Sequence, residues 1–308
     1  MTVELERPTA PAPAPAPQKP PFLARFRNPW GRPRVLPVIT AIYLLWSIVP
    51  VFVAILFAFN DGRSRTTWQG FSTRWFWGDP TQSVFHDPDL QNALKHTLFL
   101  ALICVIVAVP LGVGLALGLQ RWRGRGGGTV NVLMLLPLVT PEIVMGVALL
   151  LLFLQVFGSI GLGTTAQAIG QVTFTISYVV VIVRGRLVSI GPDYEEAAAD
   201  LGAPPRDVLF RVLLPLLAPA ILASVAVVFA LSIDDFVITQ YLSSDASTTT
   251  VSMLLYSQAR GAPTPALNAL ATVALLITLA AVVLAFLVYR RFARGDTSGA
   301  RGVAGMEV

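Results

Sequence analysis

The sequence predicts an all-α membrane protein with six transmembrane helices and with both termini in the cytosol. Three observations support this fold class: an apolar composition, six apolar stretches long enough to cross a bilayer, and an uneven distribution of arginine and lysine. Of the 308 residues, 55% are hydrophobic and 13% are charged, and the mean hydropathy is +0.69. These values are typical of a polytopic membrane protein and exclude an ordinary soluble domain.

A membrane-spanning helix needs about 20 mostly apolar residues. Six stretches meet this requirement, namely Leu36–Phe59, Ala93–Leu119, Val130–Phe157, Ala166–Val183, Leu216–Ile238 and Ala266–Tyr289. The fourth stretch is the most polar, because it contains two glutamines, two threonines and a serine. We therefore expect other helices rather than lipid to surround it. A re-entrant loop is the alternative for this stretch, but it would leave an odd number of crossings.

The placement of arginine and lysine predicts the orientation of the spans. If the N-terminus lies in the cytosol, most of the 22 Arg and Lys residues fall in cytosolic segments. The exceptions are Arg63, Arg65, Arg74, Lys95 and Arg260. The loop between the fourth and fifth spans is then cytosolic as well.

The chain is expected to consist of one transmembrane domain and two tails. Residues 1–34 include a Pro/Ala-rich run that favours an extended polyproline II conformation, so we expect a disordered cytosolic tail. Residues 35–290 form the transmembrane domain, and residues 291–308 form a second disordered cytosolic tail.

Prolines and small residues in the spans predict where helices bend and where they approach closely. Gly114 and Gly118 form a small-xxx-small pair that permits close helix contact. Each proline in or beside a span is expected to kink or end its helix, and these are Pro37, Pro50, Pro110, Pro137, Pro141, Pro215 and Pro219.

The cytosolic loop of residues 189–214 contains an acidic, alanine-rich helix. Asp193 is the expected N-cap, with Glu196 as its capping-box partner. Three alanines favour the helix, and Gly202 is expected to end it in a left-handed conformation. A second short helix, Arg206–Leu214, should then lead into the fifth span. The alternative is an amphipathic helix on the membrane surface, but such a helix should be basic with a wide apolar face.

The order Glu196-Ala197-Ala198, three residues, Gly202, nine residues, Val212-x-Leu214-Pro215 resembles the loop of binding-protein-dependent ABC importer permeases with the type I fold. In that family the loop is the coupling helix, which sits in a groove on the ATPase subunit and switches the permease between inward-open and outward-open states. The resemblance implies that this contact is carried by Glu195, Glu196, Ala197, Ala198, Asp200, Gly202 and Pro215.

Further stretches resemble the second permease of spermidine/putrescine importers, and the resemblance covers residues 36–290. They are Phe57–Asn60, Trp68–Ser72 with Trp75, Leu136–Val144, Ser232–Thr239 and Ser257–Gly261. The segment Ser243–Ser247 departs from the family's usual turn. The resemblance implies a bacterial inner-membrane permease for a polyamine or, alternatively, for another amine or amino-acid-like solute. It also implies four partners: a second permease in a heterodimer, two ATPase subunits, an extracytoplasmic solute-binding protein and membrane lipid.

Three carboxylates within the spans are candidates for the substrate pathway. Glu142 is expected near the middle of the third span, and Asp234 and Asp235 late in the fifth. An ionisable group in a span usually faces a bundle interior or an aqueous route. Adjacent helical residues differ by about 100°, so at most one aspartate faces the pathway. The alternative is structural: the aspartates brace helix ends, with Arg260 as a partner, and Glu142 is a protonated or hydrogen-bonded carboxyl beside a proline kink.

Other function classes lack a motif. Cys104 is the only cysteine, and His86 and His96 do not form a ligand-spaced pair, so no metal site is expected. No basic patch interleaved with aromatics suggests nucleic acid. The chain has no Walker phosphate loop, so it is not expected to be an enzyme, and ATP and Mg²⁺ belong to partner subunits. A secondary transporter, the rival class, predicts an inverted repeat, and no duplication is evident.

Overall fold

The computed structural model describes residues 35–64, 67–122, 124, 126–260 and 264–303. The chain divides into two parts, residues 1–53 and residues 54–308. The predicted N-terminal tail lies outside the described residues. In the first part, the described chain is the beginning of helix α2 (Val35–Ala58), whose side chains are largely exposed, as lipid contact requires.

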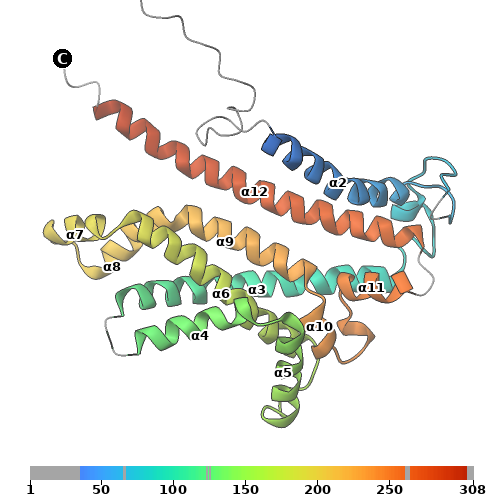
Figure 1. Ribbon diagram of the computed structural model, residues 1–308, viewed down its shortest axis with the longest axis horizontal. Helices are drawn as coiled ribbons and strands as arrows, with labels where there is room; N and C mark the ends of the chain where they lie inside the picture. Colours follow the sequence, from blue (N-terminus) through green and yellow to red (C-terminus); the bar gives the residue numbers. More distant parts are fainter. Residues whose placement is uncertain (1–34, 65–66, 123, 125, 261–263, 304–308) are drawn as a thin grey trace, which may run out of the picture. The chain divides into compact units, whose positions relative to one another are not determined.

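Five helices of the described residues are long and apolar enough to cross a membrane, and a bent pair of helices makes a sixth candidate. The long helices confirm the predicted first, second, fourth, fifth and sixth spans as helical (Figure 1). Besides α2, they are α3 (Pro88–Arg121), α6 (Thr164–Ile190), α9 (Leu214–Asp234) and α12 (Pro265–Val303). Helix α12 thus continues into the segment that the sequence assigned to the C-terminal tail.

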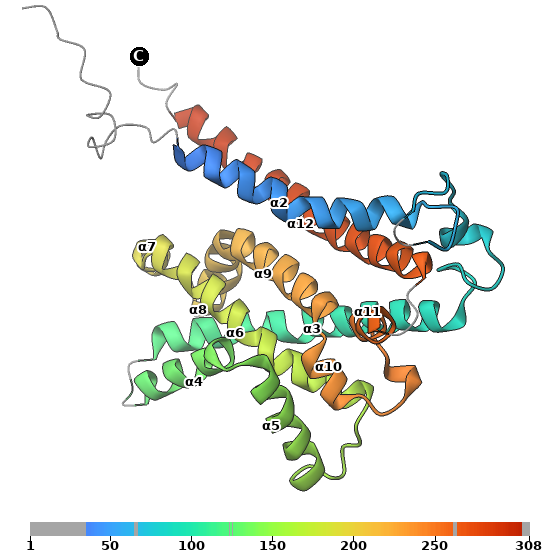
Figure 2. The ribbon, with the colours of Figure 1, turned by 45° about the vertical axis from the view of Figure 1, so that its right-hand side comes forward.

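The core of the second part lies where α3, α6 and α9 pack together (Figure 2). The polar fourth span is the most buried of the five long candidates, with 61% of its apolar window inside the protein, which confirms the expectation. Close approach of α3 and α6 occurs at Gly112, where an added Cβ would stand 2.6 Å from Val179. The predicted contact glycines are different: no atom lies within 4 Å of a Cβ built at Gly114 or Gly118.

The predicted third span is not one continuous helix. It forms α4 (Gly127–Val139) and α5 (Glu142–Gln155), which meet at an angle of 109°. Pro141 has no N–H, and it forces Thr140 into an extended conformation with φ −70° and ψ 130°. Glu142 is therefore the first residue of a new helix and does not lie in the middle of one.

The predicted fifth span ends earlier than expected. Its helix stops at Asp234, and Asp235 leaves the helical region with φ −61° and ψ 119°. A short helix, α10 (Val237–Leu242), then packs against α5 and α6. Glycines permit both contacts, because a Cβ at Gly146 would clash with Tyr241 and one at Gly170 with Ile238 and Leu242. Helix α11 (Val251–Arg260) follows.

The acidic loop forms α7 (Asp193–Asp200), followed by α8 (Pro205–Asp207) and a π-helical turn, Val208–Leu213. The predicted second short helix is not separate, since α8, the π-turn and α9 form one 30-residue helix, Pro205–Asp234. Pro215 lies in the first turn of α9. Because it lacks an N–H, it cannot donate to the carbonyl four residues earlier, which explains the wider turn before it.

Candidate functional site

Two glycines with positive φ set the ends of α7. Gly191 ends α6 with φ 74° and ψ 178°, a region that only glycine adopts readily. Gly202 follows α7 with φ +80°, so the predicted left-handed conformation is confirmed. No atom lies within 4 Å of a Cβ built at either position. Backbone conformation, and not crowding, therefore selects glycine here. Sequence reasoning identified Gly202 but missed Gly191.

Two backbone hydrogen bonds close the end of α7. The N–H of Gly202 donates to the Ala199 carbonyl over 2.8 Å, and the N–H of Ala203 donates to the Ala198 carbonyl over 3.0 Å. This pair of bonds is a Schellman motif, which satisfies carbonyls that the helix leaves unpaired. The chain reverses sharply at this point.

The start of α7 differs from the prediction. Asp193 is the first helical residue, Pro192 occupies the N-cap position, and no side chain caps the helix. The predicted capping box between Asp193 and Glu196 is therefore wrong. The helix still gains from acidic residues in its first turn, because they lie at the positive end of its dipole.

The predicted coupling residues divide between two faces of α7 and its continuation. Glu195 and Ala198 are partly buried against the bundle. The remainder are exposed, namely Glu196, Ala197, Asp200, Gly202 and Pro215. Leu201, between the helix and the glycine, is 89% exposed. Helix α7 and the residue that follows it thus expose both negative charge and one large apolar side chain.

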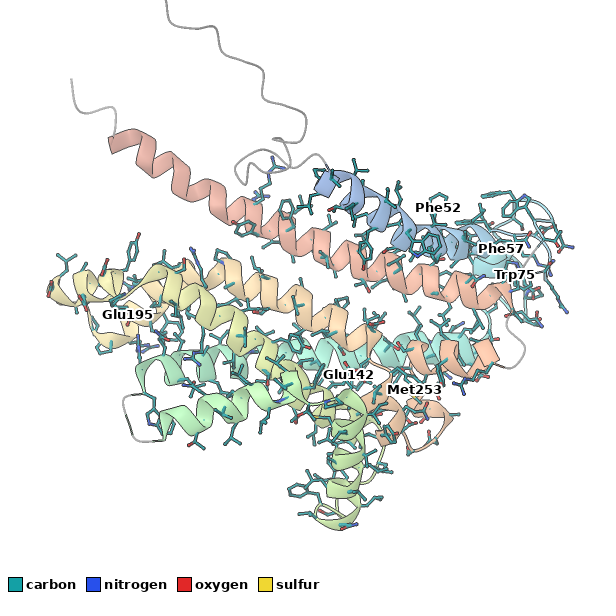
Figure 3. The ribbon with its side chains drawn as sticks, viewed as in Figure 1. Phe52, Phe57, Trp75, Glu142, Glu195 and Met253 are labelled. Atoms are coloured by element: carbon teal, nitrogen blue, oxygen red, sulfur yellow. The ribbon has the colours of Figure 1, made fainter. Side chains whose placement is uncertain are left out.

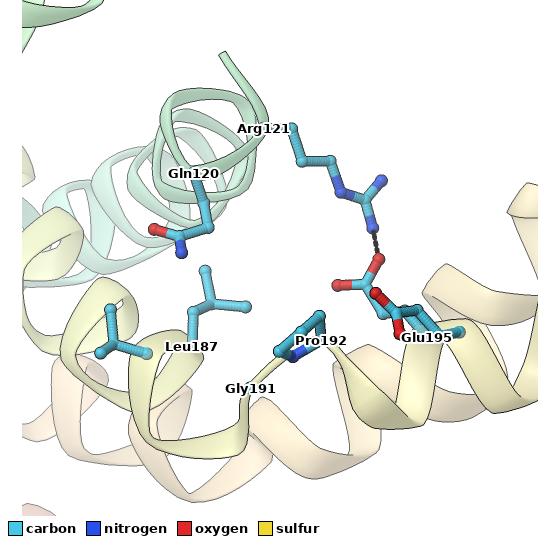
Figure 4. A pocket seen from close by; sticks show the side chains of 8 residues that line it. Gln120, Arg121, Leu187, Gly191, Pro192 and Glu195 are labelled. Carbon is cyan, nitrogen blue, oxygen red and sulfur yellow. Dashed lines mark hydrogen bonds and ion pairs between the residues drawn. The ribbon is translucent and has the colours of Figure 1, made fainter. Parts of the chain in front are cut away.

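Glu195 ties α7 to the bundle. Its carboxylate accepts a hydrogen bond from the Arg121 guanidinium at the end of α3, and the two form an ion pair (Figure 4). Beside them lies an open pocket of about 470 Å³, whose lining includes Gln120, Leu187 and Pro192. In the sequence analysis Arg121 contributed only to the prediction of membrane orientation. Its position directly after an apolar span was the available signal, but the partner is 74 residues away.

We expect an exchange of the two charges to test this contact. Arg121→Glu alone places a carboxylate beside Glu195 and Glu196 and should lower ATP-driven uptake by a few-fold, because an exposed pair contributes about 0.2–1 kcal/mol. Adding Glu195→Arg should restore part of the loss. Uptake by the two single variants and the double variant measures the coupling energy. If the loss of uptake in the double variant equals the sum of the losses in the two single variants, Arg121 and Glu195 do not interact and Arg121 is not part of the site.

Asp235 is held by hydrogen bonds to groups of α6 and α10. One carboxylate oxygen accepts from the Gln171 amide at 3.1 Å and from the Thr239 N–H at 2.9 Å. The other accepts from the Ile238 N–H at 3.3 Å, so the side chain caps α10. The predicted bracing partner Arg260 instead stacks over Tyr256 at 4.5 Å.

Asp234 and Glu142 are the exposed carboxylates of this region. Asp234 is the last residue of α9, and Glu142 is the first residue of α5. Figure 3 places Glu142 where α4 meets α5. Within the described residues neither side chain forms a hydrogen bond or an ion pair. Both carboxylates thus lie exposed at breaks in apolar helices.

A buried polar network supports the break between α9 and α10, and the sequence identified it only as polarity in the fourth span. Gln171 of α6 accepts from the Ser232 hydroxyl at 2.6 Å and from the Cys104 thiol at 3.1 Å, besides donating to Asp235. One turn earlier, Gln167 donates to the carbonyls of two further residues at 2.9 Å each and bonds to a ring nitrogen of a third at 2.8 Å; these are Thr239, Thr248 and His96.

The segment Ser243–Ser247, which departs from the family's usual turn, is ordered by its own hydrogen bonds. Asp245 caps the 3₁₀ turn Ala246–Thr248 with a capping box. Hydrogen bonds from the Ser247 hydroxyl and N–H, and from the Ser244 hydroxyl, hold the pKa of Asp245 below its usual range. A capping aspartate thus does here what glycines do in a tight turn.

Comparison with known proteins places the chain in a family. The model of the family described as "Binding-protein-dependent transport system inner membrane component" matches residues 108–295. The putrescine transport system permease protein PotI of Escherichia coli K12 is 33% identical over 282 residues, covering 90% of this chain and 95% of the relative. The spermidine/putrescine transport system permease protein PotC of the same strain is 32% identical over 258 residues, covering 84% and 94%.

A solved structure shares the fold. A chain of a bacterial ABC transporter involved in the import of alginate aligns with a TM-score of 0.67 and 17% identity, covering 88% of this chain and 98% of that one. The cytosolic location of the two termini stays a prediction. The expected all-α membrane fold of an ABC importer permease is confirmed, and so is a multi-pass location in the bacterial inner membrane. The chain therefore belongs to the binding-protein-dependent transport system inner membrane components, the permease subunits of ABC importers.

Proposed function

We propose that this permease moves a polyamine of the putrescine or spermidine type, which an extracytoplasmic binding protein delivers. The observation that carries the substrate class is the placement of exposed carboxylates, Glu142 and Asp234, at two helix breaks within apolar spans. It is supported by two relatives, each about one-third identical over most of the chain, whose names state putrescine or spermidine/putrescine transport.

The physical argument concerns the cost of moving a cation through a low-dielectric region. An ammonium group that leaves water loses several kcal/mol of hydration unless an opposite charge replaces it. Carboxylates along the route supply that charge, and their own burial is tolerated where they face an aqueous pathway. The Asp235 carboxylate is already hydrogen-bonded to Gln171 and to α10, so its role is to shape the pathway. Asp234 and Glu142 face the solute.

ATP drives the cycle through α7. We propose that α7 is the coupling helix and lies in the cytosol with both termini, where it docks to one of two ATPase subunits that bind ATP and Mg²⁺. The exposed carboxylates of α7 and the bare Leu201 side chain form the docking surface. A second permease completes a heterodimer with its own coupling helix. The chain itself carries no phosphate-binding loop.

Uptake of labelled putrescine and spermidine by the complete importer in proteoliposomes tests the substrate route. Asp234→Asn and Glu142→Gln keep shape and remove charge, and each should lower uptake at low solute concentration roughly tenfold, the size of one charge-assisted hydrogen bond. Asp89→Asn is the matched control, because Asp89 is an exposed carboxylate before the apolar part of α3 and should leave uptake unchanged.

The same assay distinguishes the alternatives. Uptake that continues without the ATPase subunits would overturn the importer mechanism. Preference for a neutral or acidic solute, with the two variants as active as wild type, would overturn the polyamine assignment while leaving the coupling role of α7 intact.

A further inference from the structure

The segment that joins α2 to α3 carries aromatic side chains that the transport mechanism does not use. We call the described residues 59–64 and 67–87 the aromatic loop. Four of its large side chains are strongly exposed: Trp68 by 44%, Phe71 by 72%, Trp77 by 60% and Phe85 by 48%. A group of large exposed aromatic side chains usually marks a surface that contacts a protein, a ligand or a membrane.

The aromatic loop is firmly built around Asn60, which is fully buried. Its amide donates to the carbonyls of Ser64 and Thr67 at 2.9 and 3.1 Å, and its side-chain oxygen accepts from the Gln69 N–H at 2.7 Å. The Asn60 carbonyl accepts from the buried Trp75 indole at 2.6 Å. The exposed rings are therefore held in place and are not on a loose chain.

An ion pair orders the π-helical turn of the aromatic loop. The Arg74 guanidinium lies 3.0 Å from the Asp79 carboxylate and 4.7 Å from the Trp75 ring centroid. Hydrogen bonds from the Thr81 N–H and from Arg74 hold the pKa of Asp79 well below its usual range. The ion pair thus holds the turn from which the exposed Trp77 side chain projects.

Three of the four exposed rings, those of Phe71, Trp77 and Phe85, belong to one continuous series of contacts. Phe71 stacks on Phe59 at 5.4 Å, and Phe59 contacts Phe76 at 5.0 Å between ring centroids. Phe76 then contacts Trp77 at 5.9 Å, and Trp77 stacks on Phe85 at 6.2 Å. Exposed rings thus occur at both ends of a single patch, which buried Phe76 anchors to the bundle.

The packing of the aromatic loop fixes its depth. Buried Trp75 and Phe76 share a hydrophobic cluster with Leu90 of α3 and with Leu267 and Leu270 in the first turns of α12 (Figure 3 shows Trp75 at this end of α12). Helix α12 is a candidate membrane span that starts at this end, so we place the beginning of a span near this level.

Helix α3 places the aromatic loop at the same depth in the membrane. Lys95 is the last charged residue before the apolar run of α3, and Leu90 precedes it by about 8 Å of helix. The headgroup region on each side of a bilayer is about 5–8 Å thick. The aromatic loop is therefore at the boundary between hydrocarbon and water.

We propose that the aromatic loop is a membrane-interface anchor, with Phe71, Trp77 and Phe85 seated in the lipid headgroup region. Trp77 suits this layer, because its ring contacts lipid chains while its indole N–H stays hydrated. Phe71 and Phe85 add apolar area beside it. The spans themselves expose apolar side chains, such as Phe99 and Leu102 on α3. The anchor fixes the height of α3 and α12 in the bilayer and is independent of the solute carried.

Site-directed spin labelling of the complete importer in phosphatidylcholine/phosphatidylglycerol liposomes tests the anchor. Cys104 is buried, and Cys104→Ser gives a cysteine-free chain, to be combined with partner subunits that lack reactive cysteine. Labels at Phe71→Cys and Trp77→Cys should be accessible to oxygen and protected from a soluble nickel chelate. A label at Asp89→Cys, an exposed carboxylate position nearby, should show the opposite preference.

Two outcomes would overturn the anchor. Nickel accessibility at positions 71 and 77 equal to that at 89 would place the patch in water. Exclusion of both reagents, or a change on adding the binding protein, would make the patch a protein interface. Because labels can perturb packing, Trp77→Phe offers a second measurement: the fluorescence lost with Trp77 should be quenched by lipids brominated near the headgroup.

Discussion

Gly191→Ala should lower ATP-driven uptake roughly tenfold while the protein still inserts in the membrane. The conformation at Gly191, φ 74° and ψ 178°, costs about 1–3 kcal/mol for a residue with a side chain. A coupling free energy of that size corresponds to about 5–150-fold. Because no atom would clash with the new methyl group, relief of strain reorients α7 and does not disturb the core. Uptake and solute-stimulated ATP hydrolysis by the reconstituted importer measure the effect.

Two other glycines provide the controls. Gly185→Ala adds the same methyl group six residues earlier, inside α6, where it meets no atom; transport should be unchanged. Gly202→Asn should retain most activity, since asparagine adopts the left-handed region with little cost, whereas Gly202→Asp adds a negative charge to the docking surface and should uncouple. Wild-type uptake by Gly191→Ala would show that the direction of α7 does not matter for coupling.

Gly112→Ala should lower the thermal stability of the folded permease more than any other glycine-to-alanine change on α3. Its Cβ would stand 2.6 Å from the Cβ of Val179 and 3.3 Å from the Ile176 carbonyl. Both helices are held in the buried core, so neither can move aside freely. Overpacking of this kind costs about 1–3 kcal/mol. The temperature of unfolding of the assembled importer, and its yield from membranes, are the measurements.

Gly114→Ala is the matched control for this prediction. It lies two residues along the same helix, and its new methyl group would meet nothing within 4 Å. Equal stability of Gly112→Ala and Gly114→Ala would mean that α3 and α6 do not approach as closely as the structure has them. A second change, Val179→Ala, removes the crowded Cγ1 but keeps the Cβ, so it should restore only part of the stability that Gly112→Ala loses.

Local rules predicted much of the coupling region from sequence. An alanine-rich acidic segment that ends at a glycine is a helix with a left-handed terminus, and α7 has this form. The capping box failed because Pro192 adopts a near-helical conformation with φ −82° and ψ −16° and takes the N-cap position itself. Helix starts depend on the conformation of the preceding residue, which propensity does not determine.

The breaks in the third and fifth spans needed the structure for different reasons. Pro141 was recognised as a kink or boundary, but a proline does not indicate whether its helix bends slightly or turns by 109°. At Asp235 no proline or glycine marks the end of α9. The break there depends on Gln171, which comes from another helix and is 64 residues distant. A span predicted from hydropathy continues until the apolar residues end. The predicted fifth span therefore continued past Asp235.

Contacts between remote segments were beyond reach of the sequence. Two small residues spaced four apart suggested that α3 packs closely at Gly114 and Gly118, but the face used inside the chain contains Gly112. Periodicity identifies which residues share a face, and not which face meets a neighbour. The same limit hid Arg121, whose role appears only once α3 and α7 are seen together.

Helix α6 has a mechanical consequence. It runs without interruption for 27 residues, a length of about 40 Å. Near its start, Gln167 and Gln171 bond to the chain around Asp235 and α10, and at its other end Gly191 connects it directly to α7. One rigid helix thus connects α7 with the break between α9 and α10. A tilt of about 10° displaces one end of such a rod by about 7 Å relative to the other.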